Sequence, residues 1–107
     1  MSDSDNNTNN PKHNETSSFS TSNNPDYAVA LGYDDQSNKA PIVLAKGQGE
    51  IAERIVAIAK EHGLEIRQDA DLLQILKTVE INQEIPIEAF AAVAEIISYI
   101  YRQNAKS

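Results

Sequence analysis

Residues 40–63 read APIVLAKGQGEIAERIVAIAKEHG, and this stretch decides the fold. Residues 42–45 form a short apolar run rich in β-branched side chains, which is typical of a strand covered on both faces. Gly47 and Gly49 then let the backbone turn sharply. The apolar residues that follow recur at helical spacing up to Gly63, which can take the left-handed position after a helix. A strand that feeds a helix this tightly predicts a small α/β sandwich.

Two further strands are expected around this unit. Residues 27–31, YAVAL, predict a strand that can pair with residues 42–45 as a hairpin, although the sequence also allows parallel pairing. Residues 64–66 predict a third strand, parallel to the strand before the helix, which makes a right-handed βαβ crossover. The fold class is therefore α/β, with a small, mostly three-stranded sheet packed by about three helices.

Each predicted helix has an expected apolar face. The helix after the glycine turn is expected to bury Ile51, Ile55, Ile58 and Ala59. A second helix, capped by Asp69, is predicted over residues 70–79. Pro86 suits the first position of a last helix. The expected inner stripe of that helix consists of Phe90, Val93, Ala94, Ile97 and Tyr101, with Ile96 and Ile100 widening it.

The first 24 residues are expected to be a disordered polar tail. Asn, Ser, Thr and Asp fill most of this stretch, and Phe19 is its one large apolar residue after the initiator. Such a segment cannot bury enough surface to offset the entropy lost on ordering it. We therefore expect one folded domain over residues 25–103.

Composition excludes several classes of function. The 107 residues carry a formal charge of −7, which disfavours a nucleic-acid partner. Without cysteine there is no disulfide, thiolate nucleophile or zinc-thiolate site. No apolar run approaches the roughly 20 residues that span a bilayer, and the N-terminus lacks the features of a secretory signal. A soluble, cytoplasmic protein without direct membrane insertion is expected.

No catalytic, metal or cofactor site can be assembled from the residues. The turn Lys46-Gly47-Gln48-Gly49 resembles a phosphate loop only weakly, because Glu50 puts a negative charge where a phosphate would sit. His13 lies in the expected tail, and His62 is placed to complement a helix dipole. The residues alone thus predict a small acidic binding domain that is not an enzyme.

Several blocks of the sequence resemble the C-terminal cytoplasmic domain of the FlhB/YscU/EscU/SpaS family of type III secretion export switch proteins. The resemblance covers residues 24–102. The blocks that carry it are Asn24-Pro25 before YAVAL, Tyr33-Asp34, Ala40-Pro41, the AKGQG turn at residues 45–49, Glu84-Ile85-Pro86 and AVAEI at residues 92–96.

The resemblance implies a domain at the export gate that changes export from rod and hook subunits to filament subunits. Members of the family cleave themselves at Asn-Pro-Thr-His, where the Asn side chain attacks its own carbonyl and the chain breaks before Pro. Here the corresponding residues are Asn24-Pro25-Asp26-Tyr27, and no apolar strand is expected before them. We therefore treat Asn24 and Pro25 as a degenerate cleavage site and expect no efficient self-cleavage.

The resemblance also implies a surface that receives export substrates. Its counterparts in this chain are Ala40, Pro41, Ala94 and Ile97. Ala40 and Pro41 stand in a turn and should be exposed, whereas the helical spacing of Ala94 and Ile97 favours packing in the core.

Our main hypothesis is a stand-alone, non-enzymatic component or regulator of flagellar type III export, located in the cytoplasm at the periphery of the inner membrane. Its partners would be export apparatus proteins, export substrates and the N-terminal part of full-length FlhB. An expected open sheet edge beside residues 27–31, centred on Val29, would accept a partner strand. The alternatives are a self-processing protein that cleaves at Asn24-Pro25, an injectisome-associated domain, and a generic interaction domain.

Overall fold

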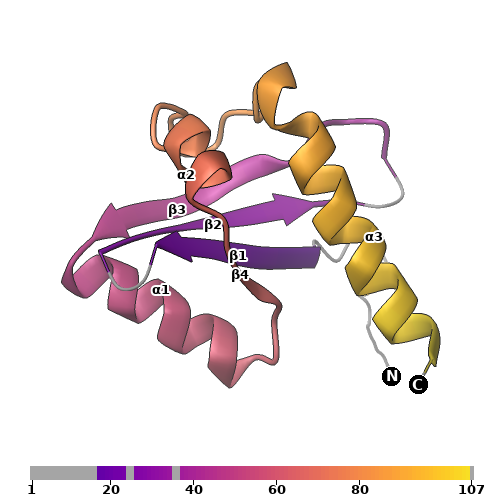
Figure 1. Cartoon of the computed structure of the whole chain (residues 1–107), viewed down its shortest axis with the longest axis horizontal. Helices are drawn as coiled ribbons and strands as arrows, with labels where there is room; N and C mark the ends of the chain where they lie inside the picture. The colour runs from indigo at the N-terminus through magenta and orange to yellow at the C-terminus, as the bar shows by residue number, and fades with distance from the viewer. Residues whose placement is uncertain (1–16, 24–25, 35–36, 107) are drawn as a thin grey trace, which may run out of the picture.

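The structure, a computed structural model, describes residues 17–23, 26–34 and 37–106. The strands are β1 (Ser17–Asn23), β2 (Tyr27–Tyr33), β3 (Ile42–Gln48) and β4 (Ile66–Gln68). The helices are α1 (Glu50–Glu61), α2 (Ala70–Leu76), the short 3₁₀ helix η3 (Ile87–Ala89) and α3 (Phe90–Lys106). The described residues form an α/β sandwich, as the sequence predicts (Figure 1).

The strands lie in the order β3-β2-β1-β4. β2 and β3 pair antiparallel, which confirms the hairpin, and β1 pairs antiparallel with β2. β4 is parallel to β1 and therefore also to β3, as predicted, but it covers Ile66–Gln68 and does not lie beside β3. The physical reason is that β1 and β2 occupy the space between them, and α1 crosses the sheet to reach its far edge.

β1 corrects the expectation of a disordered tail over residues 1–24. Residues 17–23 form a strand between β2 and β4, and Phe19 is completely buried in the main core. A polar strand is stable here because both of its edges make backbone hydrogen bonds, as in the contact from the Ser20 N–H to the Glu65 carbonyl oxygen at 2.9 Å. Residues 1–16 and residue 24 of the expected tail lie outside the described residues.

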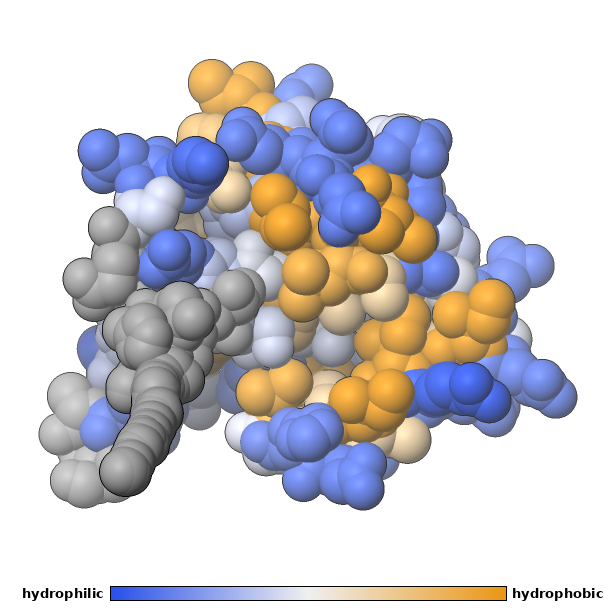
Figure 2. All heavy atoms as spheres, turned by 180° about the vertical axis from the view of Figure 1, so that it is seen from behind, coloured by the Kyte–Doolittle hydropathy of each residue, from blue (hydrophilic) through white to orange (hydrophobic). Residues whose placement is uncertain are grey.

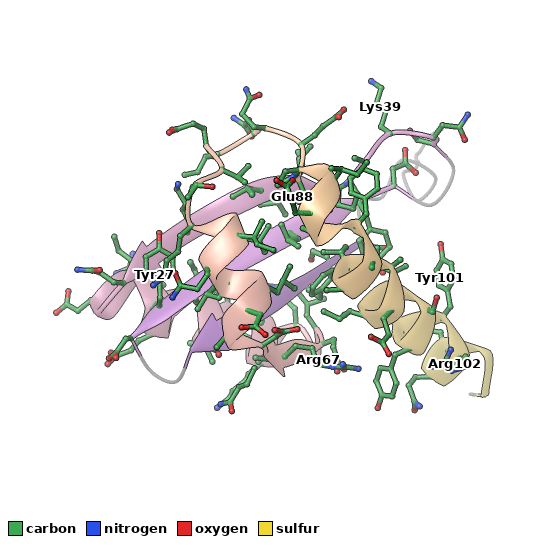
Figure 3. The ribbon with its side chains drawn as sticks, turned by 45° about the horizontal axis from the view of Figure 1, so that its top comes forward. Tyr27, Lys39, Arg67, Glu88, Tyr101 and Arg102 are labelled. Atoms are coloured by element: carbon green, nitrogen blue, oxygen red, sulfur yellow. The ribbon has the colours of Figure 1, made fainter. Side chains whose placement is uncertain are left out.

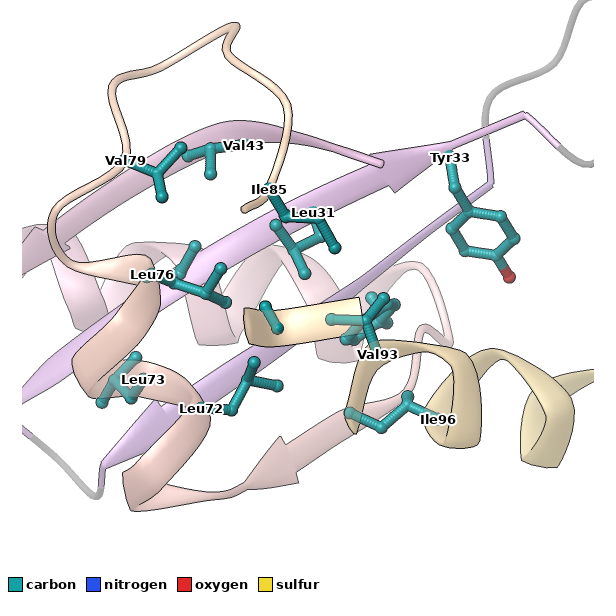
Figure 4. Packing of buried hydrophobic residues seen from close by; sticks show 13 residues of the cluster. Leu31, Tyr33, Val43, Leu72, Leu73, Leu76, Val79, Ile85, Val93 and Ile96 are labelled. Carbon is teal, nitrogen blue, oxygen red and sulfur yellow. The ribbon is translucent and has the colours of Figure 1, made fainter. Parts of the chain in front are cut away.

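Successive side chains of β2 point to opposite faces of the sheet and so contribute to two separate core clusters. Val29, Leu31 and Tyr33 join the main core cluster beneath α2 and α3, where Phe19 and Tyr33 pack with ring centroids 6.3 Å apart (Figure 4). Ala28 and Ala30 point to the other face, where they pack with α1. Because these side chains are small, α1 can lie close to the sheet.

The apolar face of α1 is only partly as expected. Ala52, Ile55 and Ala59 are buried, whereas Ile51 and Ile58 are exposed. The apolar residues of this helix are thus spread over a wider arc than the sheet covers, so one side of the arc remains at the surface.

Local sequence signals explain where most of the helices begin and end. Gly49 has φ 61°, and Gly63 has φ 68°. The Gly63 N–H bonds to the Lys60 carbonyl and the Leu64 N–H to the Ala59 carbonyl, at 3.1 and 2.8 Å, which is the Schellman pattern. Both glycines therefore act as predicted, in left-handed backbone that other residues rarely adopt.

The predicted cap of α2 is also confirmed, because the Asp69 carboxylate accepts the Leu72 N–H at 3.0 Å. This helix ends at Leu76 and not at Val79, and in the turn that follows the Thr78 hydroxyl donates to the Ile75 carbonyl oxygen at 2.9 Å.

Candidate partner-binding surface

The turn before β3 is one part of the candidate surface. Ala40 and Pro41 directly precede β3, and both are half-buried. Ala40 packs against the main core cluster, and the Pro41 carbonyl oxygen accepts a hydrogen bond from the Ile85 N–H at 2.9 Å. The turn is therefore held in place while part of each side chain remains accessible.

α3 forms the other part, and its expected inner stripe is only partly right, because Val93 and Ile96 are buried as expected but other members are not. Phe90 is 45% exposed and Ala94 is exposed, while Ile97 is half-buried at the margin of the core. Two stripes on this helix share the helical period, so the period alone could not choose between them. The residues that face the core are Ala89, Val93 and Ile96.

The exposed part of the side of α3 expected to be buried, together with Ile87 of η3, thus forms an outer apolar stripe. Figures 1 and 3 show the turn that carries Lys39 beside the first half of α3, and Ala40 and Ile97 contact the same core cluster. A cavity of about 220 Å³ adjoins Ala40. Ala40 and Ile97 therefore flank the same core cluster. The outer apolar stripe consists of Ile87, Phe90, Ala94, Ile97 and Tyr101.

Val29 does not belong to an accessible edge, which corrects the expected strand-addition site. It is completely buried, and its strand β2 pairs with β1 on one side and β3 on the other. The expectation fails because residues 17–23 fill the edge that the polar sequence seemed to leave open.

Other candidate chemistry finds little support in the geometry. Within the described ranges no group of three or more His, Asp or Glu side chains is arranged to hold a metal ion. His62 caps the C-terminal end of α1, and Lys46 donates from Nζ to the Lys77 carbonyl oxygen at 2.9 Å. The side chains of the glycine turn therefore serve the fold. His13 lies outside the described residues.

Sequence reasoning missed one cavity of about 360 Å³ between α1 and the ends of β1 and β4. Its lining mixes apolar side chains such as Val56 with the polar side chains of Ser22, Lys60 and Gln68. No local pattern could have indicated it, because the lining comes from elements far apart in the sequence.

A family model described as the FlhB HrpN YscU SpaS Family matches residues 21–100. The chain belongs to this family. The match runs from the end of β1 through most of α3, so the resemblance is confirmed over most of the described chain.

The chain is similar to curated proteins of two sizes. The uncharacterized protein YlqH of Bacillus subtilis is 41% identical over 75 residues, which cover 70% of this chain and 81% of YlqH. The flagellar biosynthetic protein FlhB of the same organism is 41% identical over 81 residues, covering 75% of this chain and 22% of FlhB. The chain therefore spans about a fifth of the length of the FlhB proteins that it matches.

Solved structures show the same fold. The cytoplasmic domain of FlhB from Shewanella putrefaciens matches with a TM-score of 0.72 and 35% identity, over 82% of this chain and 70% of that one. A mutated EscU C-terminal domain matches with a TM-score of 0.71 and 24% identity, over 76% of this chain and 81% of that one. In the described part of this chain, no helix has the length and apolarity needed to span a membrane.

Asn24 and Pro25, expected from the sequence to be a degenerate cleavage site, lie outside the described residues. The strands around it are placed: β1 ends at Asn23, which pairs with Tyr27 at the start of β2. The Asp26 carbonyl oxygen accepts the Gly49 N–H at 3.1 Å. The glycine turn therefore anchors the residue that follows the pair.

Proposed function

We propose that this protein is a non-enzymatic, FlhB-like component or regulator of the flagellar type III export apparatus. The observation that carries the proposal is the match to an FlhB cytoplasmic domain at 35% identity over 82% of this chain. The family match over residues 21–100 also includes the turn at Ala40-Pro41. The protein would act in the cytoplasm beside the export gate.

The proposed binding surface consists of Ala40, Pro41 and the outer apolar stripe of α3. Apolar side chains that remain half-exposed on a fixed helix and a fixed turn suit the docking of an apolar segment. We propose export substrates and export apparatus proteins as the partners, including the N-terminal part of full-length FlhB.

Complementation tests this function. The chain is expressed in cells whose FlhB lacks its C-terminal domain, and motility and secreted subunits are measured. Ala94→Glu should abolish any restored or altered export, because it places a charge in the apolar stripe. Ala91→Glu is the matched control, since Ala91 is also exposed on α3 but lies outside the stripe. Export that is unaffected by the chain, or equally affected by both variants, would contradict the proposal.

The proposal includes the absence of efficient self-cleavage. The residues after Asn24-Pro25 are Asp26 and Tyr27, so the Thr-His of the family marker is missing. Intact-mass measurement of the purified protein should therefore give the uncut chain after prolonged incubation. A fragment that begins at Pro25 would favour the alternative of a self-processing protein.

A further inference from the structure

The first half of the outer edge of β3 already makes backbone hydrogen bonds to another segment of the chain. The Val43 N–H donates to the Gln83 carbonyl oxygen at 3.0 Å, and the Asn82 N–H donates to the Val43 carbonyl oxygen at 2.7 Å. Ile42 also forms an isolated antiparallel bridge with Glu84. This edge therefore has a geometry that accepts an extended segment.

The second half of the edge, residues 44–48, has no such partner within the described part of the chain. The hydrogen bond from the Gly49 N–H to the Asp26 carbonyl oxygen fixes the phase of the antiparallel ladder between β3 and β2. Since bonded and non-bonded pairs alternate, the N–H and C=O groups of Lys46 and Gln48 point away from β2. These groups form an unpaired edge.

Two large apolar side chains flank this edge on the face that carries α1. The register shift opposite Ala30 and Leu31 makes Leu44 the extra residue of a bulge, and its side chain is 40% exposed. Ile51 is 57% exposed and lies against Gly47. Figure 2, which views this face, shows apolar side chains gathered there.

A nearly apolar groove continues the same surface. It has a volume of about 180 Å³, and Leu44, Ala45 and Ile58 contribute to its lining. An extended segment beside residues 44–48 would place alternate side chains over Leu44 and Ile51, at the mouth of this groove.

We propose that residues 44–48 of β3 bind an extended segment of a partner protein, which joins the sheet as an additional strand. The segment carries apolar residues at alternate positions and a neutral or positive net charge. A second copy of this chain fits poorly, because each copy carries a charge of −7 and the two would repel. The opposite edge is a weaker candidate, since β4 has only three residues.

This interaction differs from the α3 surface and does not require the partner to belong to the export apparatus. Its specificity would come from the apolar side chains, and its affinity from backbone hydrogen bonds to Lys46 and Gln48. The proposal can therefore be tested by removing a backbone N–H group without removing the apolar side chains.

Lys46→Pro removes one outward N–H, which makes no hydrogen bond to β2. Proline is tolerated at such positions of edge strands, so the sheet should persist. Lys46→Ala is the matched control, because it also loses the Nζ contact to Lys77 but keeps the N–H. Gln48→Pro and Gln48→Ala form a second pair at an exposed side chain. Circular dichroism identifies the variants that fold.

The probe is a soluble ten-residue peptide of alternating valine and threonine with lysine at both ends. Binding is followed by amide NMR titration and hydrogen exchange. The full chain and Lys46→Ala should both bind the peptide, and binding should protect the backbone amides of residues 46 and 48 from exchange. Folded Lys46→Pro should bind the peptide at least tenfold more weakly. Equal binding by the Pro and Ala variants, changes confined to α3, or no binding at millimolar peptide would each overturn the proposal.

Discussion

Phe19 should be one of the most costly single positions to truncate, although it stands in the most polar part of the chain. Its side chain is completely buried and packs against Tyr33 in the main core. Replacing a fully buried Phe by Ala costs about 3–5 kcal/mol. Domains of this size unfold with about 5–15 kcal/mol in total, so Phe19→Ala should remove a large part of the stability.

Phe90→Ala is the matched control, because the same atoms are deleted from a ring that is 45% exposed. Only part of its transfer free energy is lost, so we expect a cost of about 1 kcal/mol. The free energy of unfolding is measured by urea titration, followed by far-ultraviolet circular dichroism and tyrosine fluorescence.

With an m-value of about 1.5 kcal/mol/M, Phe19→Ala should lower the urea midpoint by about 2–3 M. A disordered first segment predicts no change at all. If the midpoint of Phe19→Ala stays within about 0.5 M of the parent, or if Phe90→Ala costs as much, then β1 does not belong to the sheet and the reasoning fails.

Three further predictions use the same unfolding assay. A Cβ at Gly47 would lie 2.7 Å from Cβ of Ile51 and closer still to its Cγ2, so Gly47→Ala should destabilise the protein. Ile51→Ala removes Cγ2 but keeps Cβ, so the double variant should recover only part of that cost; fully additive costs would contradict the contact. Asp69→Ala should cost about 1 kcal/mol by removing the α2 cap, whereas Asp69→Asn should cost much less; equal costs would show that the cap hydrogen bond is unimportant. Ala94→Glu should change the free energy of unfolding by less than about 0.5 kcal/mol, whereas Ala89→Glu should unfold the protein because Ala89 is completely buried. The reverse order would show that Ala94, and not Ala89, faces the core.

Features with a local cause could be predicted from the sequence. The turn at Gly49, the helix stop at Gly63 and the cap at Asp69 each depend on the conformational or hydrogen-bonding preference of one residue. The existence of β2 and β3 also follows from short-range pattern, although that pattern left both antiparallel and parallel pairing open. These elements were sufficient to recognise the family through its motifs.

Features decided by tertiary contacts could not be predicted in the same way. β1 is a strand because its neighbours supply hydrogen bonds on both edges, which no propensity in SSFSTSN indicates. The rotation of α3 depends on which of two equally periodic stripes meets the core. For the candidate site, Ala40 and Pro41 were expected to be exposed and are half-buried, whereas Val29 was placed on an edge that does not exist.

The position of β1 also constrains how the chain folds during its synthesis. The first described strand pairs with the last one, as in the register of Thr21 with Arg67, so this part of the sheet has a high contact order. The ribosome releases β1 and β2 well before β4, and the nascent hairpin must keep one polar edge unpaired in that interval. Serine and threonine at that edge are well solvated by water, so the composition that obscures β1 in the sequence also protects the emerging chain from aggregation.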